Sequence, residues 1–455
     1  MSGQFQLLKT RRFAPFFVTQ FLGAFNDNLF KNAVIVLLTF HAATWTTIRP
    51  ELLANLAAGV FILPFFIFSA TAGQLADKYD KAMLARVVKV LEMLIMGVAA
   101  TGFWLQSLPV LMGALFLHGM HSTLIGPVKN AILPQHLRED ELIGGNALVE
   151  AGTFIAILLG TLAGGLLAGS VEHPVLIAFG GLLVALAGYL SSRSIPSAPA
   201  PEPGLAINLN PLSETWRNIQ FAREDRLVFI AILSISWFWL YGALFLAQFP
   251  AYAKNVLGGN EAAVTLLLAI FSFGIGIGSL LCERMSGKHL EIGLVPFGAI
   301  GLTLFGLDLY FSSPSVLPEN LPLALSALLA QPGSWRVLAD LLMIGVFGGF
   351  FIVPLYALLQ VRSAPAHRAR IIAANNILNA LFMVVGALGA GALLGAGVSI
   401  PALFGGAALL NALVAIYIYR LVPEFLLRFI AWLLVKAVYR LRAGGLENIP
   451  HEGAA

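Results

Sequence analysis

The chain has 455 residues, of which 58% are hydrophobic and 11% are charged. Soluble domains have an apolar share near 45–50% and a charged share of about 25%, so the composition excludes a soluble fold and predicts an all-α polytopic membrane protein. The formal net charge of +4 does not indicate nucleic acid as a partner, because basic residues in a membrane chain mostly mark cytoplasmic loops. The single cysteine, Cys282, excludes an intramolecular disulfide and a thiolate metal cluster.

The first long hydrophobic segment contains ionisable side chains in its middle. Residues 13–22 and 33–40 are apolar, and the polar residues between them are Asn26, Asp27, Asn28, Lys31 and Asn32. Moving an ionisable group to mid-bilayer costs about 2.5–3.5 kcal/mol on insertion scales, so such groups face the interior of a helix bundle or a wet cavity. We therefore expect this segment to line a pathway across the membrane.

Apolar stretches of about 20 residues recur along the chain and predict about twelve transmembrane helices. The expected ranges are 13–41, 51–76, 83–106, 108–134, 142–169, 173–192, 226–254, 259–284, 290–312, 337–362, 370–396 and 400–420. Glycines spaced four apart, Gly160 with Gly164 and Gly391 with Gly395, predict close packing between helices.

The distribution of basic residues predicts the orientation. The joints that follow even-numbered helices hold most of the lysines and arginines, whereas the odd-numbered joints hold only Arg49, Lys254 and Arg336. By the positive-inside rule, the even-numbered joints and both termini are cytoplasmic. This independent signal agrees with an even number of spans.

The least apolar stretch divides the chain into two bundles. Residues 193–225 are rich in proline and predict a cytoplasmic linker between an N-terminal six-helix bundle, 1–192, and a C-terminal six-helix bundle, 226–420. A second proline-rich stretch, 312–335, predicts an extracytoplasmic loop with a short interfacial helix. Residues 421–455 predict an interfacial helix with basic anchors, followed by a tail.

The clearest motif lies between the second and third predicted helices and reads Gly73-Gln74-Leu75-Ala76-Asp77-Lys78-Tyr79-Asp80-Lys81. It resembles the signature of the major facilitator superfamily at this position, with Asp80 where a glycine is usual. The resemblance implies a major facilitator fold, in which two parallel six-helix repeats hold the transport site between them. The two predicted bundles of this chain fit that architecture.

The same motif predicts a cytoplasmic gate. Gly73 permits close helix contact, Asp77 can complement the N-terminus of a helix, and the cations Lys78 and Lys81 can pair across the gate. The counterpart of Asp77 and Lys78 after the eighth predicted helix is Glu283-Arg284. We expect gating to break and remake contacts among these residues.

Three further stretches, 20–28, 127–134 and 146–165, look like the bacterial lysophospholipid transporter family. The resemblance implies a multi-pass protein of the bacterial inner membrane that moves lysophosphatidylethanolamine and related lysolipids from the outer to the inner leaflet for reacylation. It implies no cofactor. A coupling cation, sodium or proton, stays open, and no nucleotide-binding loop is present in the sequence.

The resemblance also suggests roles for the polar residues. Lys31 and Lys129 could hold a phosphate, and Asp27 or Glu150 could receive an ammonium head group. Asp27 and Lys31 are four apart on one helix face, as are Asn146 and Glu150, which predicts two polar stripes. The remaining candidates for substrate or coupling-ion contacts are Asn28, Trp239, Gln248, Asn375 and Asn376.

Structural readings of these residues stay open. Asp27 with Lys31 can be an internally neutralising pair. The asparagines Asn375 and Asn376 can join helices by hydrogen bonds, and Trp239 can be an anchor at the membrane interface. His118 and His121 share a predicted helix without a third ligand nearby in the sequence, so we expect no metal site and no catalytic residues.

The end of the chain, residues 445–453, is similar to the lead-in of glycerolipid acyltransferases, in which a His-x-x-x-x-Asp motif follows. That motif is absent from the sequence. The similarity implies the transporter domain of a transporter–acyltransferase fusion, with the acyltransferase in cis or as a separate protein; a standalone transporter is the alternative. Two other functions compete: a cation-coupled transporter of another small amphiphile, and a non-transporting membrane anchor for an acyltransferase.

Overall fold

The long apolar segments form long helices, because a backbone inside a bilayer must satisfy its hydrogen bonds within the protein. The computed structural model describes residues 3–40, 50–170, 174–287, 289–314, 322–421 and 423–438. A short 3₁₀ helix, η1, comes first. The elements are η1 Gln4–Lys9, α1 Ala14–Phe40, α2 Pro50–Lys78, α3 Lys81–Trp104, α4 Leu108–His136, α5 Glu139–Ser170, α6 Val175–Ser192, α7 Pro211–Glu224, α8 Arg226–Asn255, α9 Glu261–Ser286, α10 Leu294–Ser312, α11 Leu325–Ala330, α12 Ser334–Arg362, α13 Arg368–Gly395, α14 Ile400–Leu421 and α15 Pro423–Val438.

Each predicted span coincides with one long helix. Among the described residues, 11 helices are long and apolar enough to cross a membrane. The one predicted span that is not among these 11 is the third in the chain, 83–106. It corresponds to α3, a helix of 24 residues that buries Lys81, Lys89 and Glu92. These charges lower the hydropathy of α3, and their burial inside the bundle explains how it still belongs to a membrane fold. The prediction of an all-α polytopic membrane protein is confirmed.

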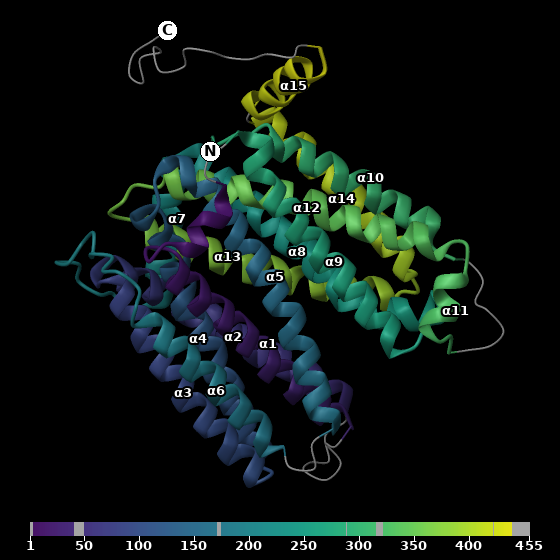
Figure 1. Ribbon diagram of the computed structural model, residues 1–455, viewed down its shortest axis with the longest axis horizontal. Helices are drawn as coiled ribbons and strands as arrows, with labels where there is room; N and C mark the ends of the chain where they lie inside the picture. Colours follow the sequence, from purple (N-terminus) through teal and green to yellow (C-terminus); the bar gives the residue numbers. More distant parts are fainter. Residues whose placement is uncertain are drawn as a thin grey trace.

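Two groups of six long helices repeat one packing pattern. In the first group α1 packs on α5, α2 on α4, and α3 on α4 and α6. In the second group α8 packs on α13, α9 on α12, and α10 on α12 and α14. Figure 1 shows the purple and blue helices of the first group beside the green and yellow helices of the second. The groups meet where α5 packs on α9 and α2 on α13, as expected of parallel repeats.

Among the described residues, three α-helices lie outside these groups, as does the 3₁₀ helix η1. The linker contains α7, which the sequence did not predict; Pro211 starts it, and the Asn210 side chain accepts hydrogen bonds from the backbone nitrogens of Leu212 and Ser213 at 3.0 and 3.2 Å. The short α11 lies in the stretch predicted to hold an interfacial helix, and α15 in the predicted C-terminal helix. The stretch similar to acyltransferases, 445–453, lies outside the described residues.

Glycines bring α5 against α1. A Cβ added at Gly160 would lie 2.3 Å from the carbonyl oxygen of Phe25, and one added at Gly164 would lie 2.3 Å from that of Leu29. The predicted close packing is therefore present at this pair. For Gly391 and Gly395 the prediction is wrong, because no atom of the described chain lies within 4 Å of an added Cβ. Glycine spacing does not reveal whether a neighbouring helix covers that face.

We expect Gly160→Leu to lower the midpoint of thermal unfolding in detergent, because the new side chain must push α5 away from α1. Overpacking of this kind costs about 1–3 kcal/mol. Gly169→Leu on the same helix is the control, since nothing lies within 4 Å of an added Cβ there. Equal midpoints for the two variants would contradict the close packing of α5 on α1.

Candidate functional site

Asp27 lies in the interior of the first group of helices, where its carboxylate faces α4. Its Oδ2 accepts a hydrogen bond from Ser122 Oγ at 2.5 Å. Its Oδ1 lies 2.8 Å from Nε2 of His118 and 3.6 Å from Nδ1 of His121. Both histidines stood out in the sequence, but nothing in the sequence connected them with Asp27. The Asp27 carboxylate therefore interacts with two imidazole rings.

Lys31 lies one turn further along α1 and takes a different environment. Its Nζ donates a hydrogen bond to Asn28 Oδ1 at 3.1 Å and lies 5.2 Å from the centre of the Phe61 ring. Within the described part of the chain, no carboxylate oxygen lies within 4 Å of this ammonium. The direct Asp27–Lys31 ion pair is thus not formed, and the Lys31 side chain is left for an anion to approach.

Two buried charges on α3 extend the environment of Asp27 and were missed in the sequence. Glu92 Oε2 lies 2.5 Å from Nζ of Lys89 and 3.2 Å from Nε2 of His121. Glu92 Oε1 accepts a hydrogen bond from Asn26 Nδ2 at 2.6 Å. The cost of placing charges in a membrane, which singled out Asp27, applies equally to Lys89 and Glu92 within the apolar range 83–106 and could have found them.

The two residues of the second predicted stripe, Glu150 and Asn146, have different partners. Lys129 on α4 places Nζ 3.5 Å from Oε1 of Glu150 on α5, and it donates to Thr153 Oγ1 at 3.1 Å. Glu150 is buried, whereas the Lys129 side chain is 17% exposed. The proposed phosphate and ammonium ligands are therefore adjacent, as a loosely paired cation and anion. Asn146, one turn before Glu150, contacts Gln360 instead, through hydrogen bonds of 2.7 and 2.9 Å.

The Asn146–Gln360 contact joins α5 to α12, so it crosses between the two groups of helices. A second contact between the groups lies nearby: the Trp239 ring stacks on Phe154 of α5 with centroids 6.1 Å apart. The Trp239 indole also donates a hydrogen bond to the Tyr356 hydroxyl at 3.0 Å. Neither Gln360 nor Tyr356 was a sequence candidate, because each is a single polar residue in an apolar run.

The remaining candidates lie on α8 and α13. Asn375 is fully buried close to Tyr356, and neither atom of its amide makes a hydrogen bond of good geometry within the described part of the chain. A buried polar group left unpaired costs about 1–3 kcal/mol, so this amide marks a place for a polar ligand or water. Asn376 is half-buried on α13 and faces Gly126, whose added Cβ would lie 2.6 Å from its Nδ2. Gln248 is half-buried on α8.

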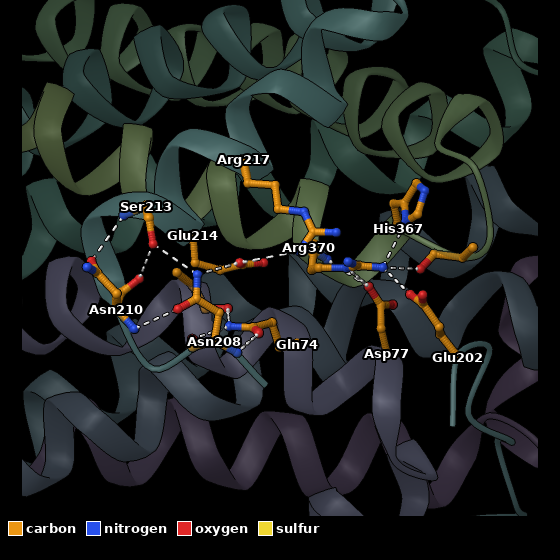
Figure 2. Close-up of polar contacts among 12 residues, drawn as sticks. Gln74, Asp77, Glu202, Asn208, Asn210, Ser213, Glu214, Arg217, His367 and Arg370 are labelled. Atoms are coloured by element: carbon orange, nitrogen blue, oxygen red, sulfur yellow. Dashed lines mark hydrogen bonds and ion pairs between the residues drawn. The ribbon is translucent and has the colours of Figure 1, made fainter. Parts of the chain in front are cut away.

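At one end of the bundle, Asp77 ties α2 to the N-terminus of α13 (Figure 2). Its carboxylate accepts hydrogen bonds from the backbone nitrogens of Ala369 and Arg370 at 3.1 and 3.3 Å. It also accepts one from Nε of Arg370 at 3.1 Å, and both side chains are buried. This is the helix N-terminus contact expected of Asp77, and it closes the two groups of helices at this end.

The linker and α7 cover that contact. Figure 2 shows Glu202 beside the Arg370 guanidinium, with which it forms an ion pair. The same guanidinium lies 5.0 Å from the centre of the Phe221 ring of α7. Phe221 also stacks on His367 with centroids 4.2 Å apart. Arg370 therefore holds α2, α13 and the linker together.

The other predicted gate residues are more dispersed. An added Cβ at Gly73 would lie 2.7 Å from the Ala373 side chain, which places α2 directly against α13. Lys81 is buried near Asp77, and Lys78 lies over the ring of Tyr79. Glu283 accepts a hydrogen bond from the backbone nitrogen of Gln4 at 2.9 Å, and Arg284 is exposed. The cation that meets Asp77 is thus Arg370, which was not among the predicted gate residues.

Asp80 replaces the usual glycine of the motif and caps α3. Its carboxylate accepts hydrogen bonds from the backbone nitrogen of Met83 at 2.8 Å and from Ser197 Oγ at 2.6 Å. Burial raises the pKa of Asp80, but the hydrogen bonds from Ser197, Met83 and Ala198 outweigh it and hold this pKa below its ordinary value. The turn therefore needs no glycine, because Asp80 has an extended backbone with φ −60°.

Two packed six-helix groups with buried charges between their helices, joined at one end by a buried ion pair, have the architecture of secondary transporters. The sequence model of the Major Facilitator Superfamily matches residues 16–386. The lysophospholipid transporter LplT of Escherichia coli O157:H7 is 30% identical over 76% of this chain and 79% of its own length. LplT of Enterobacter sp. (strain 638) is 29% identical over 75% of this chain and 78% of its own length. The chain therefore belongs to the major facilitator superfamily and, within it, to the family of these LplT relatives.

Solved structures show the same fold at low sequence identity. The human organic anion transporter MFSD10 (TETRAN) has a TM-score of 0.69 and 14% identity, covering 90% of this chain and 99% of its own. The transporter FucP in the outward conformation has a TM-score of 0.65 and 14% identity, covering 89% of this chain and 97% of its own. These likenesses concern the fold alone.

We expect Arg370→Gln to loosen the closed end of the bundle. The variant leaves Asp77 buried without its cation, and breaking a buried ion pair in this way costs about 3–5 kcal/mol. Ser69 lies one turn from Gly73 on the same face of α2 and is buried. In a Cys282→Ser background, a Ser69→Cys thiol should react faster with a maleimide when Arg370→Gln is added.

Arg193→Gln is the control for this measurement, because Arg193 is exposed at the end of α6. It should leave the labelling rate of the thiol unchanged. If Arg370→Gln also leaves that rate unchanged, the Asp77–Arg370 contact does not hold this end closed.

Proposed function

We propose that this protein, a transporter rather than an enzyme, moves lysophospholipids across the bacterial inner membrane. Its substrates would be lysophosphatidylethanolamine and related one-chain lipids, carried from the outer to the inner leaflet by alternating access, with both termini in the cytoplasm. The similarity to proteins named lysophospholipid transporters over three quarters of the chain supports the substrate class. The basic joints support the orientation.

The observation that carries the proposal is the loose pairing of Lys129 with Glu150. Their charged atoms lie 3.5 Å apart, longer than the 2.7–2.9 Å of a strong charge-assisted hydrogen bond. A zwitterionic head group presents one phosphate and one ammonium, so it can replace this pair by two new ones without leaving a buried charge unpaired. The amide of Asn375, close to Tyr356, supplies a further polar contact for this head group. Lys31 lies several turns away from Lys129 along the bundle and would contact the phosphate at another stage of the crossing.

The acyl chain requires an apolar surface beside the polar one. A pocket of about 550 Å³ lies among α8, α13 and α14, where it is lined by residues that include Leu240, Leu244, Leu393, Leu410 and Leu413. In this arrangement the hydrocarbon chain stays in an apolar setting while the head group crosses.

The gate gives the direction of entry. Because Asp77 and Arg370 close the end that carries the linker, a substrate in this state enters from the opposite, outer side. Delivered lysolipid would be reacylated by an acyltransferase, either in cis or as a separate protein. A membrane anchor alone does not account for the buried carboxylate of Glu150 beside Lys129, since an anchor has no use for buried charges.

Leaflet-resolved flipping of labelled lysophosphatidylethanolamine in proteoliposomes tests the proposal. The native protein should flip the lipid faster than empty vesicles do. Lys129→Ala should lower the rate about tenfold or more, because a hydrogen bond to a charged group contributes about 1.5–3 kcal/mol. Lys254→Ala is the matched control, since Lys254 is exposed at the end of α8.

Native protein that flips no faster than empty vesicles would overturn the lysolipid assignment. Flipping of unrelated single-chain amphiphiles at the same rate would favour the broader transporter of small amphiphiles. Full activity of Lys129→Ala would remove Lys129 from the head-group site and leave the transport function standing.

A further inference from the structure

The two groups of helices meet along two interfaces, and different contacts hold these together at the end that carries the linker. At the interface of α2 with α13, Asp77 accepts hydrogen bonds from the backbone nitrogens of Ala369 and Arg370, in the first turn of α13. The interface of α5 with α9 is its equivalent, because α2 and α9 are the second long helices of their groups, and α13 and α5 are the fifth. Glu283, the counterpart of Asp77, lies near the end of α9.

Glu283 contacts η1, whereas Asp77 contacts the neighbouring long helix directly. The Oε2 atom of Glu283 accepts a hydrogen bond from the backbone nitrogen of Gln4 at 2.9 Å. The buried side chain of Gln4 donates from Nε2 to the carbonyl oxygen of Leu280 on α9, also at 2.9 Å. The start of α1 lies at the linker end, because Ser191 at the end of α6 donates a hydrogen bond to the carbonyl oxygen of Pro15. η1 therefore binds α9 at this end of the bundle.

The charge of α5 explains why η1 takes this place. The first turn of α5 contains three acidic residues, Glu139, Asp140 and Glu141. α13 instead begins with two arginines, Arg368 and Arg370. Because like charges repel, the carboxylate of Glu283 is disfavoured at the start of α5, whereas the uncharged backbone nitrogen of η1 is a suitable partner. Arg12, which follows η1, forms an ion pair with Glu141 and so holds this segment on α5.

η1, α5 and α9 meet at Gly144. A Cβ added there would lie 2.9 Å from Cβ of Gln4 and 3.3 Å from the carboxyl carbon of Glu283. A glycine at this position therefore leaves the room that η1 needs between the two long helices. Because η1 is continuous with α1 and is tied to α5 by Arg12, it belongs to the first group of helices. Its contacts with Glu283 and Leu280 are the ones that break when α9 moves away from α5.

We propose that η1 is a latch, which stays with the first group of helices and holds α9 against α5 until its hydrogen bonds with Glu283 and Leu280 break. The inference rests on the alternating access of the proposed function and adds the contact that controls the second interface. Opening the first interface separates two buried charges, Asp77 and Arg370, whereas opening the second breaks hydrogen bonds from Gln4, which carries no charge. Release of the latch therefore costs less free energy, and the interface of α5 with α9 opens first.

A buried thiol on the α5 side of this interface tests the latch. Ala147 is fully buried and lies between Gly144 and Ala151 on one face of α5. Ala151 faces α9, because its side chain lies 4.0 Å from a Cβ added at Gly276. In a Cys282→Ser background, an Ala147→Cys thiol should therefore react slowly with a maleimide while the latch is closed.

Glu283→Ala should raise this labelling rate about tenfold or more, the factor that one hydrogen bond to a charged group is worth. Gln4→Ala, which removes the hydrogen bond to Leu280, should raise the rate to a smaller extent. The matched controls are Arg284→Ala and Gln6→Ala, because both side chains are exposed beside the residues of the latch. Both controls should leave the rate unchanged.

A thiol at Ala185 of α6, which is buried within the first group, separates opening from general loosening and should stay slow in every variant. The latch is overturned if Glu283→Ala and Gln4→Ala both leave the Ala147→Cys rate unchanged, or if they accelerate Ala185→Cys equally. Should Glu283→Ala fail to fold, Gln4→Ala decides, since Gln4 lies outside the long helices. The labelling needs no lipid, so a native protein that flips no lysolipid would overturn the proposed function without changing this result.

Discussion

Charges buried among these helices need partners, and several of the partners come from another helix, which constrains the arrangement of the bundle. Asp27 of α1 meets His118 and His121 of α4, and Asp77 of α2 meets Arg370 of α13. An unpaired charge in a low-dielectric interior is far costlier than a paired one. These contacts therefore fix which helices are neighbours and how each is rotated, where apolar side chains alone would allow sliding.

The same constraint would link the proposed gate to transport. If this end opens, Asp77 must leave Arg370, and the linker groups that cover Arg370, Glu202 and Phe221, must move with it. Buried pairs of this kind have two stable arrangements, formed or hydrated, and few in between. Transport would thus couple two ion pairs. A substrate can separate the loose pair of Lys129 with Glu150, whereas only a movement of whole helices can break the tight pair of Asp77 with Arg370.

The helices were largely predictable because apolar length is a local property, and each of the predicted ranges coincides with one long helix. The sequence missed α7, since a polar helix in a proline-rich stretch has no hydropathy signal and depends on contacts such as Phe221 with His367. It predicted packing at Gly391 and Gly395 wrongly, because a pair of glycines shows only that a close neighbour is permitted. Lys89 and Glu92 could have been found by the reasoning applied to Asp27.

The sequence by itself determined the membrane class, the positions of the long apolar helices and the presence of costly charges at Asp27, Lys129 and Glu150, because the free energy of placing a residue in a bilayer depends on that residue and its near neighbours. Only the tertiary structure decided the partners. Asp27 meets His118 rather than Lys31, and Asp77 meets Arg370, almost 300 positions away, rather than Glu283 or Arg284. Partner choice depends on helix rotation and packing, which sum over contacts distant in the chain and leave no local pattern in it.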